Sequence, residues 1–518
     1  MSSSNPHQDP PVDEQDGSEP EMLDEDEIAE VAADDDDGDV AMDSDDEGAG
    51  AAQEGQEEIH LQNDSIAYFD AHKDSVFAIA QHPTFPSLIA TGGSEGEADD
   101  APGKGYVFST SAAPSRPVLP ASYSGDERPQ NTRLEPLFEI DGHTDSINAL
   151  TFTLPSGEFL LSGGMDGQLR AYSVSSSPES DKPRITFLSS SAEVSEINWL
   201  APCPSPANPN TVALGASDGS VWVYALDNAD PSNALQIVQS YFLHTAPCTA
   251  GAWTPDGSLL ATVSEDGSLY VYDVFGLAAA KGLATENGQT VVGLTDADQR
   301  FAVEGGLYSV AVNPTGAFVA VGGAGGAIKV VSLPRVSEPA AATGKGKGGA
   351  ASRRGGASAA SQAASPQAGT ILASLGVQSD GIETLAFAPA PNNLLAAGSV
   401  DGSIAVFDAG RGFAVRKHIR GAHEDFSTVK VEFVRGAAGP AAGWLLTSCG
   451  MDGVVRRWDL RGATPGAGAE AGAAGLVKEW KGHRGDGEGG GVLGFVQGET
   501  GERVVTAGDD GVVLVFEA

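Results

Sequence analysis

The segment "LLTSCGMDGVVRRWDL" (residues 445–460) consists of two apolar runs on either side of the dipeptide Asp452-Gly453. Asp-Gly between two such runs is the strongest short-range signal for a β-hairpin, because the tight turn requires positive φ angles that glycine adopts without steric cost. The second run alternates between apolar and polar residues, which is typical of a strand with one buried face. The segment therefore predicts two strands joined by a tight turn.

The frame of this hairpin recurs along the chain. In six copies an aromatic residue follows the turn aspartate by six positions, and a further apolar run ending near Pro or Gly precedes most hairpins. The related segments are "LLSGGMDGQLRAYSV" (160–174), "VALGASDGSVWVYAL" (212–226), "LATVSEDGSLYVYDV" (260–274), "VAVGGAGGAIKVVSL" (319–333), "LAAGSVDGSIAVFDA" (395–409) and "VVTAGDDGVVLVFEA" (504–518). With a first unit that begins at "SVFAIAQHP" (75–83), the chain has eight units, and such repetition predicts an array of small sheets.

A histidine before the first strand and an aromatic residue at the end of the third resemble WD repeats, although only "RRWDL" (456–460) carries the literal Trp-Asp pair. The resemblance implies an all-β fold, an eight-bladed WD-repeat β-propeller over residues 59–518. We expect flexible insertions at about 275–303 and 334–369, because both ranges are of low complexity or rich in Ala, Gly and Thr.

The stretch "DSIAYFD" (64–70) reads like the last strand of a repeat unit, yet no unit precedes it. An open propeller would leave sheet edges exposed, so the first and last blades are expected to share strands. We therefore predict that Ser65–Phe69 completes the last blade and closes the ring.

Residues 1–58 contain 23 Asp or Glu and no Lys or Arg, within a chain whose net charge is −43. Such a segment cannot bury enough apolar surface to offset its ordering entropy, so we expect a disordered acidic tail. It either keeps the protein soluble or attracts a basic partner. The sign of the charge argues against nucleic acid as the main ligand.

The three cysteines, Cys203, Cys248 and Cys449, are few and widely scattered. They indicate a reducing compartment, hence a cytoplasmic location with the nucleus as a second possibility, and no disulfide framework. The sequence shows neither an apolar run long enough for a membrane span nor a secretory signal, so no membrane partner is expected.

Histidine, serine or threonine, and aspartate recur together in four units, a combination that also occurs in hydrolases. Recurrence argues against catalysis, because an enzyme needs one such set, and buried polar groups in a repeat need hydrogen-bond partners. We therefore predict a structural network and no enzymatic activity. Its members are His143, Ser162, Asp166 and Tyr172; His244, Thr262, Asp266 and Tyr272; His423, Ser448, Asp452 and Trp458; and His483, Thr506, Asp510 and Phe516. No metal or cofactor is expected, because His and Cys show no ligand-like spacing and "GKGKGG" lacks phosphate-loop spacing.

Acidic residues gather in the loops before the first strands and in the Asp-Gly turns, which open on one face of a propeller. They are Asp74, Asp145, Glu193, Glu196, Glu265, Glu383, Asp425 and Asp509. Charges of one sign are often only solvated. The alternative is an acidic surface that attracts a cationic protein segment.

Particular stretches, "NDSIAYFDAHKDSVFAIAQHP" (63–83), "EVSEINWL" (193–200) and the C-terminal repeat, resemble the WD-repeat chaperones of ribosome assembly and the family of angio-associated migratory cell protein. The resemblance implies a monomeric chaperone dedicated to a basic large-subunit ribosomal protein of the L-ten type, nascent or free. It implies that the basic N-terminal segment of this client, met at the translating ribosome or afterwards, binds the acidic face and that the client enters 60S assembly. The contacts carried over by motif are Asp145, Glu193, Glu196 and Asp509.

Two other functions remain open at this point. "WDLR" (458–461) resembles the W-D-x-R signature of substrate receptors of cullin ubiquitin ligases, with Trp458, Asp459 and Arg461 as its defining residues. A histone-binding propeller is the second, because histones are cationic clients as well.

Overall fold

The structure, a computed structural model, describes residues 63–96, 98, 101–113, 131–177, 180–229, 233–285, 287–336, 367–436, 441, 443–462, 475–484 and 490–518. The predicted tail (1–58) and most of the predicted insertion at 334–369 lie outside these residues. None of the helices within the described ranges is long and apolar enough to cross a membrane.

The described strands form eight separate sheets, numbered here as blades in chain order. Blade 1 consists of β2 (Ala78–Gln81), β3 (Leu88–Ser94), β4 (Gly103–Ser109) and β6 (Pro136–Ile140), and blade 2 of β7 (Ile147–Phe152), β8 (Phe159–Gly164), β9 (Leu169–Ser177) and β10 (Ser180–Ser191). Blade 3 consists of β11 (Ile197–Pro202), β12 (Thr211–Ala216), β13 (Val221–Leu226) and β14 (Leu235–Tyr241), and blade 4 of β15 (Cys248–Trp253), β16 (Leu260–Ser264), β17 (Leu269–Tyr272) and β18 (Thr290–Leu294).

Blade 5 consists of β19 (Leu307–Val312), β20 (Phe318–Gly323), β21 (Ala327–Ser332) and β22 (Ile371–Gly376), and blade 6 of β23 (Ile382–Phe387), β24 (Leu394–Ser399), β25 (Ile404–Asp408) and β26 (Ala414–Ile419). Blade 7 consists of β27 (Thr428–Phe433), β28 (Leu445–Gly450), β29 (Val455–Asp459) and β30 (Leu476–Trp480). Blade 8 consists of β31 (Val492–Val496), β32 (Arg503–Gly508), β33 (Val513–Glu517), β1 (Ala67–Phe69) and β5 (Thr132–Arg133). The described helical segments are short 3-10 turns: η2 (Thr110–Ala112), η4 (Ala279–Lys281), η5 (Ala324–Gly326) and η6 (Ala409–Arg411).

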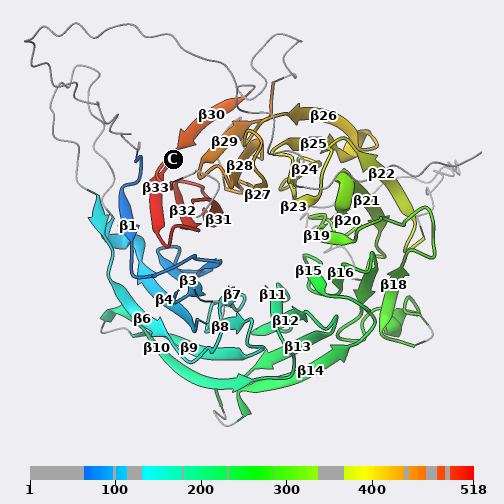
Figure 1. The fold of residues 1–518 in the computed structure, drawn as a ribbon. Helices are drawn as coiled ribbons and strands as arrows, with labels where there is room; N and C mark the ends of the chain where they lie inside the picture. Colours follow the sequence, from blue (N-terminus) through cyan, green and yellow to red (C-terminus); the bar gives the residue numbers. More distant parts are fainter. Residues whose placement is uncertain are drawn as a thin grey trace, which may run out of the picture. The chain divides into compact units, whose positions relative to one another are not determined.

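The blades succeed one another around an axis, with the first strand of each blade innermost (Figure 1). Neighbouring sheets pack face to face. Between blades 1 and 2, for example, Val107 and Ile140 meet Phe152, Leu160 and Tyr172, all of them buried. Each fully buried side chain of this size contributes about 1.5–3 kcal/mol to stability. The eight-bladed WD-repeat propeller expected from the repeats is thus confirmed.

The predicted Asp-Gly turns join the second and third strands. In blade 7 the turn lies between β28 and β29, and Gly453 has a φ of 72°, the left-handed region that glycine adopts readily. Strands β28 and β29 then pair antiparallel, with Leu446 opposite Trp458. The same positive φ recurs at Gly167, Gly219, Gly267, Gly402 and Gly511, and the turn sets the register of the second and third strands in those blades.

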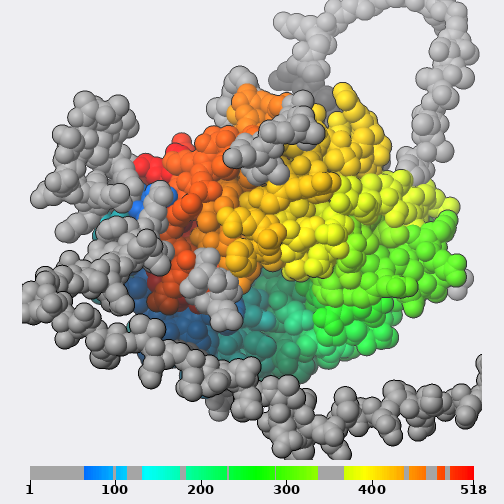
Figure 2. Space-filling view, turned by 45° about the horizontal axis from the view of Figure 1, so that its top comes forward, coloured from blue at the N-terminus to red at the C-terminus, as the bar shows by residue number. Residues whose placement is uncertain are grey.

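The ring is closed by β1, as the stretch at residues 64–70 predicts. β1 pairs antiparallel with β33, with Ala67 opposite Val515 and Phe69 opposite Val513. Figure 2 shows the C-terminal strands in red bordering the N-terminal part in blue. One feature was not foreseen: β5 pairs in parallel with β1, so blade 8 has a fifth strand.

The side chains of β1 fill the gap between blades 8 and 1. Phe69 is completely buried and stacks on Phe108 of blade 1, with 4.5 Å between the ring centroids. The same cluster contains Val505 and Val515 of blade 8. β1 therefore joins the two ends of the ring both by its backbone pairing and by its core contacts.

The range 275–303 is not the flexible insertion that its composition suggested. It contains η4 and β18, and β18 is the fourth strand of blade 4. Phe301 in the same range is completely buried in the cluster shared by blades 4 and 5. The Ala- and Gly-rich composition hid this strand, because its apolar run, "TVVGL", is only five residues long.

We predict that Phe69→Ala lowers the free energy of unfolding by about 3–5 kcal/mol, because it opens a cavity at the junction that closes the ring. Urea denaturation followed by far-UV circular dichroism measures the change. Phe85→Ala is the matched control, since Phe85 is 49% exposed, and it should change stability by about 0.5 kcal/mol or less. Equal effects of the two substitutions would contradict the closing role of β1.

Deletion of residues 59–70 removes β1 and should destabilise the whole ring. Deletion of residues 1–55 keeps β1 and should leave the thermal unfolding temperature within a few degrees of the full chain. Differential scanning calorimetry of both truncations tests this, and an intact unfolding transition without 59–70 would contradict it.

Candidate functional site

One end of the propeller carries the loops that precede the first strands and the turns that join second to third strands. These two kinds of segment share one end because successive strands run antiparallel. Backbone hydrogen bonds connect them: Met165 N donates to Ser146 O (2.9 Å), and Asp509 N donates to Gly491 O (2.9 Å). We call this end the upper face and the opposite end the lower face.

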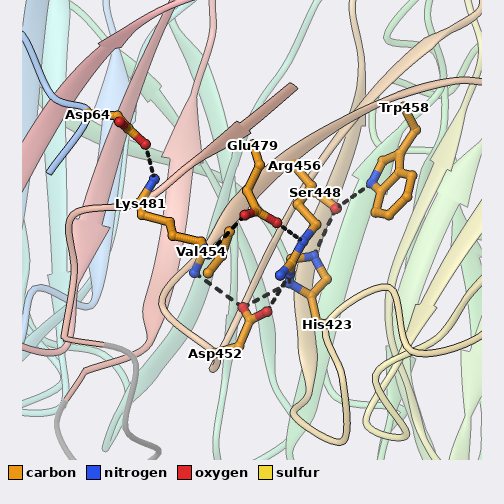
Figure 3. A network of polar contacts seen from close by, with 9 residues as sticks. All are labelled: Asp64, His423, Ser448, Asp452, Val454, Arg456, Trp458, Glu479 and Lys481. Atoms are coloured by element: carbon orange, nitrogen blue, oxygen red, sulfur yellow. Dashed lines mark hydrogen bonds and ion pairs between the residues drawn. The ribbon is translucent and has the colours of Figure 1, made fainter. Parts of the chain in front are cut away.

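Blade 7 shows how a buried network holds an upper loop against its turn (Figure 3). His423 Nδ1 lies 2.9 Å from Asp452 Oδ1, and His423 Nε2 lies 2.8 Å from Ser448 Oγ. Trp458 Nε1 donates to Ser448 Oγ at 2.9 Å. The loop, the second strand, the turn and the third strand are thereby connected through side chains.

Blades 2 and 8 have the same arrangement of histidine, hydroxyl group and aspartate. His143 contacts Asp166 (Nδ1 to Oδ1, 3.1 Å) and Ser162 (Nε2 to Oγ, 2.8 Å). His483 contacts Asp510 (3.0 Å) and Thr506 (2.8 Å) through the same nitrogens. The aromatic residues differ in their contacts: the Tyr172 hydroxyl accepts a hydrogen bond from Arg170, whereas Phe516 is buried next to Trp480.

In blade 4 the connection between histidine and aspartate passes through a serine. His244 Nε2 contacts Thr262 Oγ1 at 2.8 Å, but its Nδ1 contacts Ser268 Oγ at 2.6 Å and lies 3.9 Å from Asp266. Ser268 Oγ donates in turn to Asp266. Tyr272 is completely buried in the core cluster of blades 3 and 4.

Two further blades have network residues outside the four predicted sets. In blade 1, His72 Nε2 contacts Thr91 Oγ1 at 2.9 Å. In blade 6, the histidine is replaced by Gln378, whose Nε2 donates to Ser403 O at 3.0 Å. The alignment of "QSDGI" (378–382) with "HTDSI" (143–147) was the signal that could have identified Gln378.

These networks are too buried to act on a substrate. The side chains of the four predicted histidines have no exposed surface, and a general base must reach the proton that it abstracts. Burial lowers the pKa of His143 and of His423, although hydrogen bonds to Asp166 and Asp452 oppose the effect. The lowered pKa favours the neutral form of His143 and His423, and the buried hydrogen bonds of all four histidines stabilise the fold. Within the described ranges, no group of three or more His, Cys, Asp or Glu residues could hold a metal ion.

The network of blade 7 extends to the segment that closes the ring. Arg456 Nη1 donates to Asp452 Oδ2, and Arg456 Nε donates to Glu479 Oε2 at 2.8 Å. Lys481 Nζ lies 3.1 Å from Glu479, and Lys481 N donates to Asp64 Oδ2 at 3.0 Å (Figure 3). Asp64 precedes β1, so polar contacts connect the closing strand with blade 7.

Three predicted acidic residues are positioned on the upper face by local hydrogen bonds. Asp74 Oδ1 accepts from Ser75 N (2.8 Å), and Asp145 Oδ1 accepts from Ser146 N (2.6 Å). Asp509 Oδ1 accepts from Ser75 Oγ (2.6 Å), which connects the turn of blade 8 with the loop of blade 1. All three acids are half-buried, and this limits the orientations of their carboxylates.

The other predicted acids lie on the same face with fewer constraints. Glu193, Glu265, Glu383 and Asp425 are exposed, and Glu196 is half-buried. The pKa of Glu383 is raised by partial burial and by the neighbouring charge of Asp380. The structure thus brings the eight acids to one end, spread over different blades rather than gathered at one point.

Lys73, one of the cations in the upper loops, is already paired. Lys73 Nζ lies 2.5 Å from Glu95 Oε1. A ligand that supplies several positive charges would therefore meet carboxylates that have no lysine or arginine partner in the described contacts, such as Asp145 and Asp509.

The W-D-x-R segment provides less accessible surface than its signature suggests. Trp458 is buried in the core of blade 7, and Arg461 forms an ion pair with Asp459, with Nη2 2.5 Å from Oδ2.

Comparison with known proteins places these features in a family. Residues 134–173, 235–273 and 369–408 match the family model described as "WD domain, G-beta repeat". The chain is 30% identical over 223 residues to ribosome assembly protein SQT1 of Saccharomyces cerevisiae, a match that spans 42% of this chain and 43% of that protein. It is 24% identical over 458 residues to angio-associated migratory cell protein of Homo sapiens, covering 88% and 80% of the two chains.

Solved structures extend the similarity. Sqt1 of Chaetomium thermophilum is 64% identical, with a TM-score of 0.75, and the match covers 88% of this chain and 98% of that chain. A second structure of the same protein, bound to the N-terminus of ribosomal protein L10, matches with the same identity and TM-score over 88% and 100% of the two chains.

The buried histidines predict a loss of stability in mild acid. Burial lowers the pKa of His72 to about 4, so between about pH 6.5 and 4 the unfolded chain binds a proton at this residue that the folded chain does not. Stability should therefore fall as the pH falls from 7.0 to 5.0, by up to about 1.4 kcal/mol per pH unit for each such histidine. Urea denaturation at pH 7.0, 6.0 and 5.0 measures this slope.

His72→Gln supplies the control, because glutamine can still contact Thr91 but does not titrate. The variant should show a shallower dependence on pH than the wild type. An unchanged slope would mean that His72 is not neutral in the folded protein.

Proposed function

Because the chain belongs to the Sqt1 family of WD-repeat ribosome assembly proteins, we propose that it is a dedicated chaperone for ribosomal protein L10 of the large subunit. It captures the basic N-terminal segment of L10 on the acidic upper face and supports assembly of the 60S subunit. The observation that carries this proposal is the relative that is 64% identical along nearly its whole length and has been solved with the N-terminus of L10 bound.

The chemistry of the upper face fits such a client. Carboxylates from different blades surround the axis, so an extended basic segment can meet several of them in succession. Their charges raise the rate of encounter with a cationic partner and disfavour acidic ones. Asp145 and Asp509 are held by hydrogen bonds, and little conformational freedom remains to be lost when they bind a cation.

The protein acts by binding, without catalysing a reaction. One relative that it matches is described as a ribosome assembly protein, and three ranges of the chain match the WD-domain family model. The histidine-containing sets that resemble catalytic groups are buried and recur from blade to blade. The proposed site of action is the cytoplasm, where a monomer meets L10 as a nascent or newly released chain.

We predict that reversing Asp145, Glu193 and Asp509 to lysine lowers affinity for a peptide of the L10 N-terminus at least tenfold at low salt, because three attractive charges become repulsive. Isothermal titration calorimetry measures the affinity. For the wild type, affinity should weaken steeply as salt is raised.

The matched control reverses Glu158, Glu499 and Glu502, which are exposed acids in the lower-face turns. It makes the same change in net charge and should bind almost normally. Equal loss of affinity in both triple variants would mean that total charge, rather than the upper face, governs binding. Co-purification from cells separates the rival functions: L10 at near-unit stoichiometry supports the proposal, and a cullin adaptor or core histones would replace it.

A further inference from the structure

The first strand of each blade contains one distinctive position near the upper face. In blades 2 to 8 the pairing of the first and second strands is shifted by one extra residue, so that this residue has no partner. We call these residues the inner ring: Asn148, Asn198, Thr249, Tyr308, Glu383, Val429 and Leu493. All of them are at least partly exposed. Because the first strands are innermost, the ring surrounds the propeller axis.

Phe77 is the member of the inner ring from blade 1. Ser94 N donates to Ser75 O in this blade, as Met165 N donates to Ser146 O in blade 2. Ser75 is therefore equivalent to Ser146. Phe77, two residues after Ser75 in the sequence, is equivalent to Asn148, two residues after Ser146. Phe77 is 42% exposed, which is a large fraction for a phenylalanine next to the propeller axis.

Polar members of the ring connect neighbouring blades. Asn198 Nδ2 of blade 3 donates to Cys248 O of blade 4 at 3.0 Å. Thr249 Oγ1 of blade 4 donates to Leu307 O of blade 5 at 2.7 Å. On this side of the ring, the need to join the blades explains the residue type.

The members from blades 7, 8 and 1 are Val429, Leu493 and Phe77, whose side chains have no polar atoms for such bonds. They are neighbours: β31 of blade 8 contacts both β27 of blade 7 and β2 of blade 1, and a Cβ at Gly494, next to Leu493, would lie 3.3 Å from Ile79 Cγ2. Val429 packs against the core cluster that contains Val492 and Phe495 of blade 8.

Met451, in the turn of blade 7, continues this surface, because its sulfur would lie 2.6 Å from a Cβ at Gly491, two residues before Leu493. We call the four side chains of Val429, Met451, Leu493 and Phe77 the apolar arc. Phe77 is exposed, and the other three side chains are partly exposed.

Carboxylates border the apolar arc. Asp509 lies between the members from blades 8 and 1, because Ser75, two residues before Phe77, donates to its Oδ1. Asp74 and Asp425 stand in the loops that lead to Phe77 and Val429. An occupant of this arc therefore needs a bulky apolar side chain with positive charges on both sides.

We propose that the apolar arc is a specificity subsite, which binds one bulky apolar side chain of the basic client segment and thereby sets the register of the whole segment. This rests on the proposed function and adds sequence selectivity to it. Charge alone attracts any cationic chain, whereas an apolar contact of defined position distinguishes one basic segment from another.

The test uses two fluorescently labelled peptides and fluorescence anisotropy at several salt concentrations. One is a peptide of the L10 N-terminus from the same organism, and the other has serine at each bulky apolar residue with all charges retained. The serine peptide should bind wild-type protein about tenfold more weakly, which is the size expected for loss of one well-packed apolar contact. Phe77→Ser and Leu493→Ser should each weaken binding of the natural peptide by a similar factor.

Salt dependence separates this contact from the electrostatic one. Phe77→Ser should leave the slope of log Kd against log salt unchanged, whereas Asp509→Asn should reduce it, because only the second removes a charge. Phe85→Ser is the matched control: Phe85 is 49% exposed at the lower end of the same blade, and its replacement should leave Kd unchanged. Thermal unfolding of each variant verifies the fold.

Equal affinity of wild-type protein for the two peptides would overturn the subsite while leaving the acidic face as the binding site. The peptide comparison needs no variant of the protein, so a folding defect in Phe77→Ser cannot obscure this outcome. If neither peptide binds at low salt, the proposed function and the subsite are both overturned.

Discussion

The pairing of β1 with β33 is the constraint on which the rest of the structure depends. Each blade packs only against its neighbours, so an open ring would expose the edge of β33 and the core around Phe69. The strand that prevents this comes from the other end of the propeller sequence, and its pairing must therefore offset the entropy of a long loop closure. Stacking of Phe69 on Phe108 and the contacts of Asp64 with Lys481 supply the compensating interactions.

Once the ring is closed, the buried polar networks determine where the acids lie. A histidine that contacts both a strand hydroxyl and a turn aspartate leaves the upper loop little freedom to move. Acidic residues in these loops, such as Asp145, are thereby held in defined positions by hydrogen bonds rather than by ion pairs. The residues that look catalytic in the sequence thus provide the scaffold, and the binding surface is built from their neighbours.

The upper face is uneven around the axis. Asn198 and Thr249 connect blades 3, 4 and 5, whereas Phe77 and Leu493 leave apolar surface at blades 1 and 8 beside Asp509. The blade junction closed by β1 is therefore also the place where apolar and acidic groups are adjacent. A protein that must select one basic segment among the many cationic chains of a cell benefits from such a combination, because charge and shape are tested together.

The sequence by itself determined the repeat, the hairpins, the closing strand and the acidic character of the loops, because each of these depends on short-range spacing. It also identified the networks of blades 2, 4, 7 and 8, but it left out the contact of His72 in blade 1 and missed Gln378 and the strand within 275–303. Only the tertiary structure decided that β5 joins blade 8, that Ser268 stands between His244 and Asp266, and that the inner ring surrounds one axis. The reason is physical: the inner ring is made of one residue from each blade, and residues so distant in sequence become neighbours only when the ring closes.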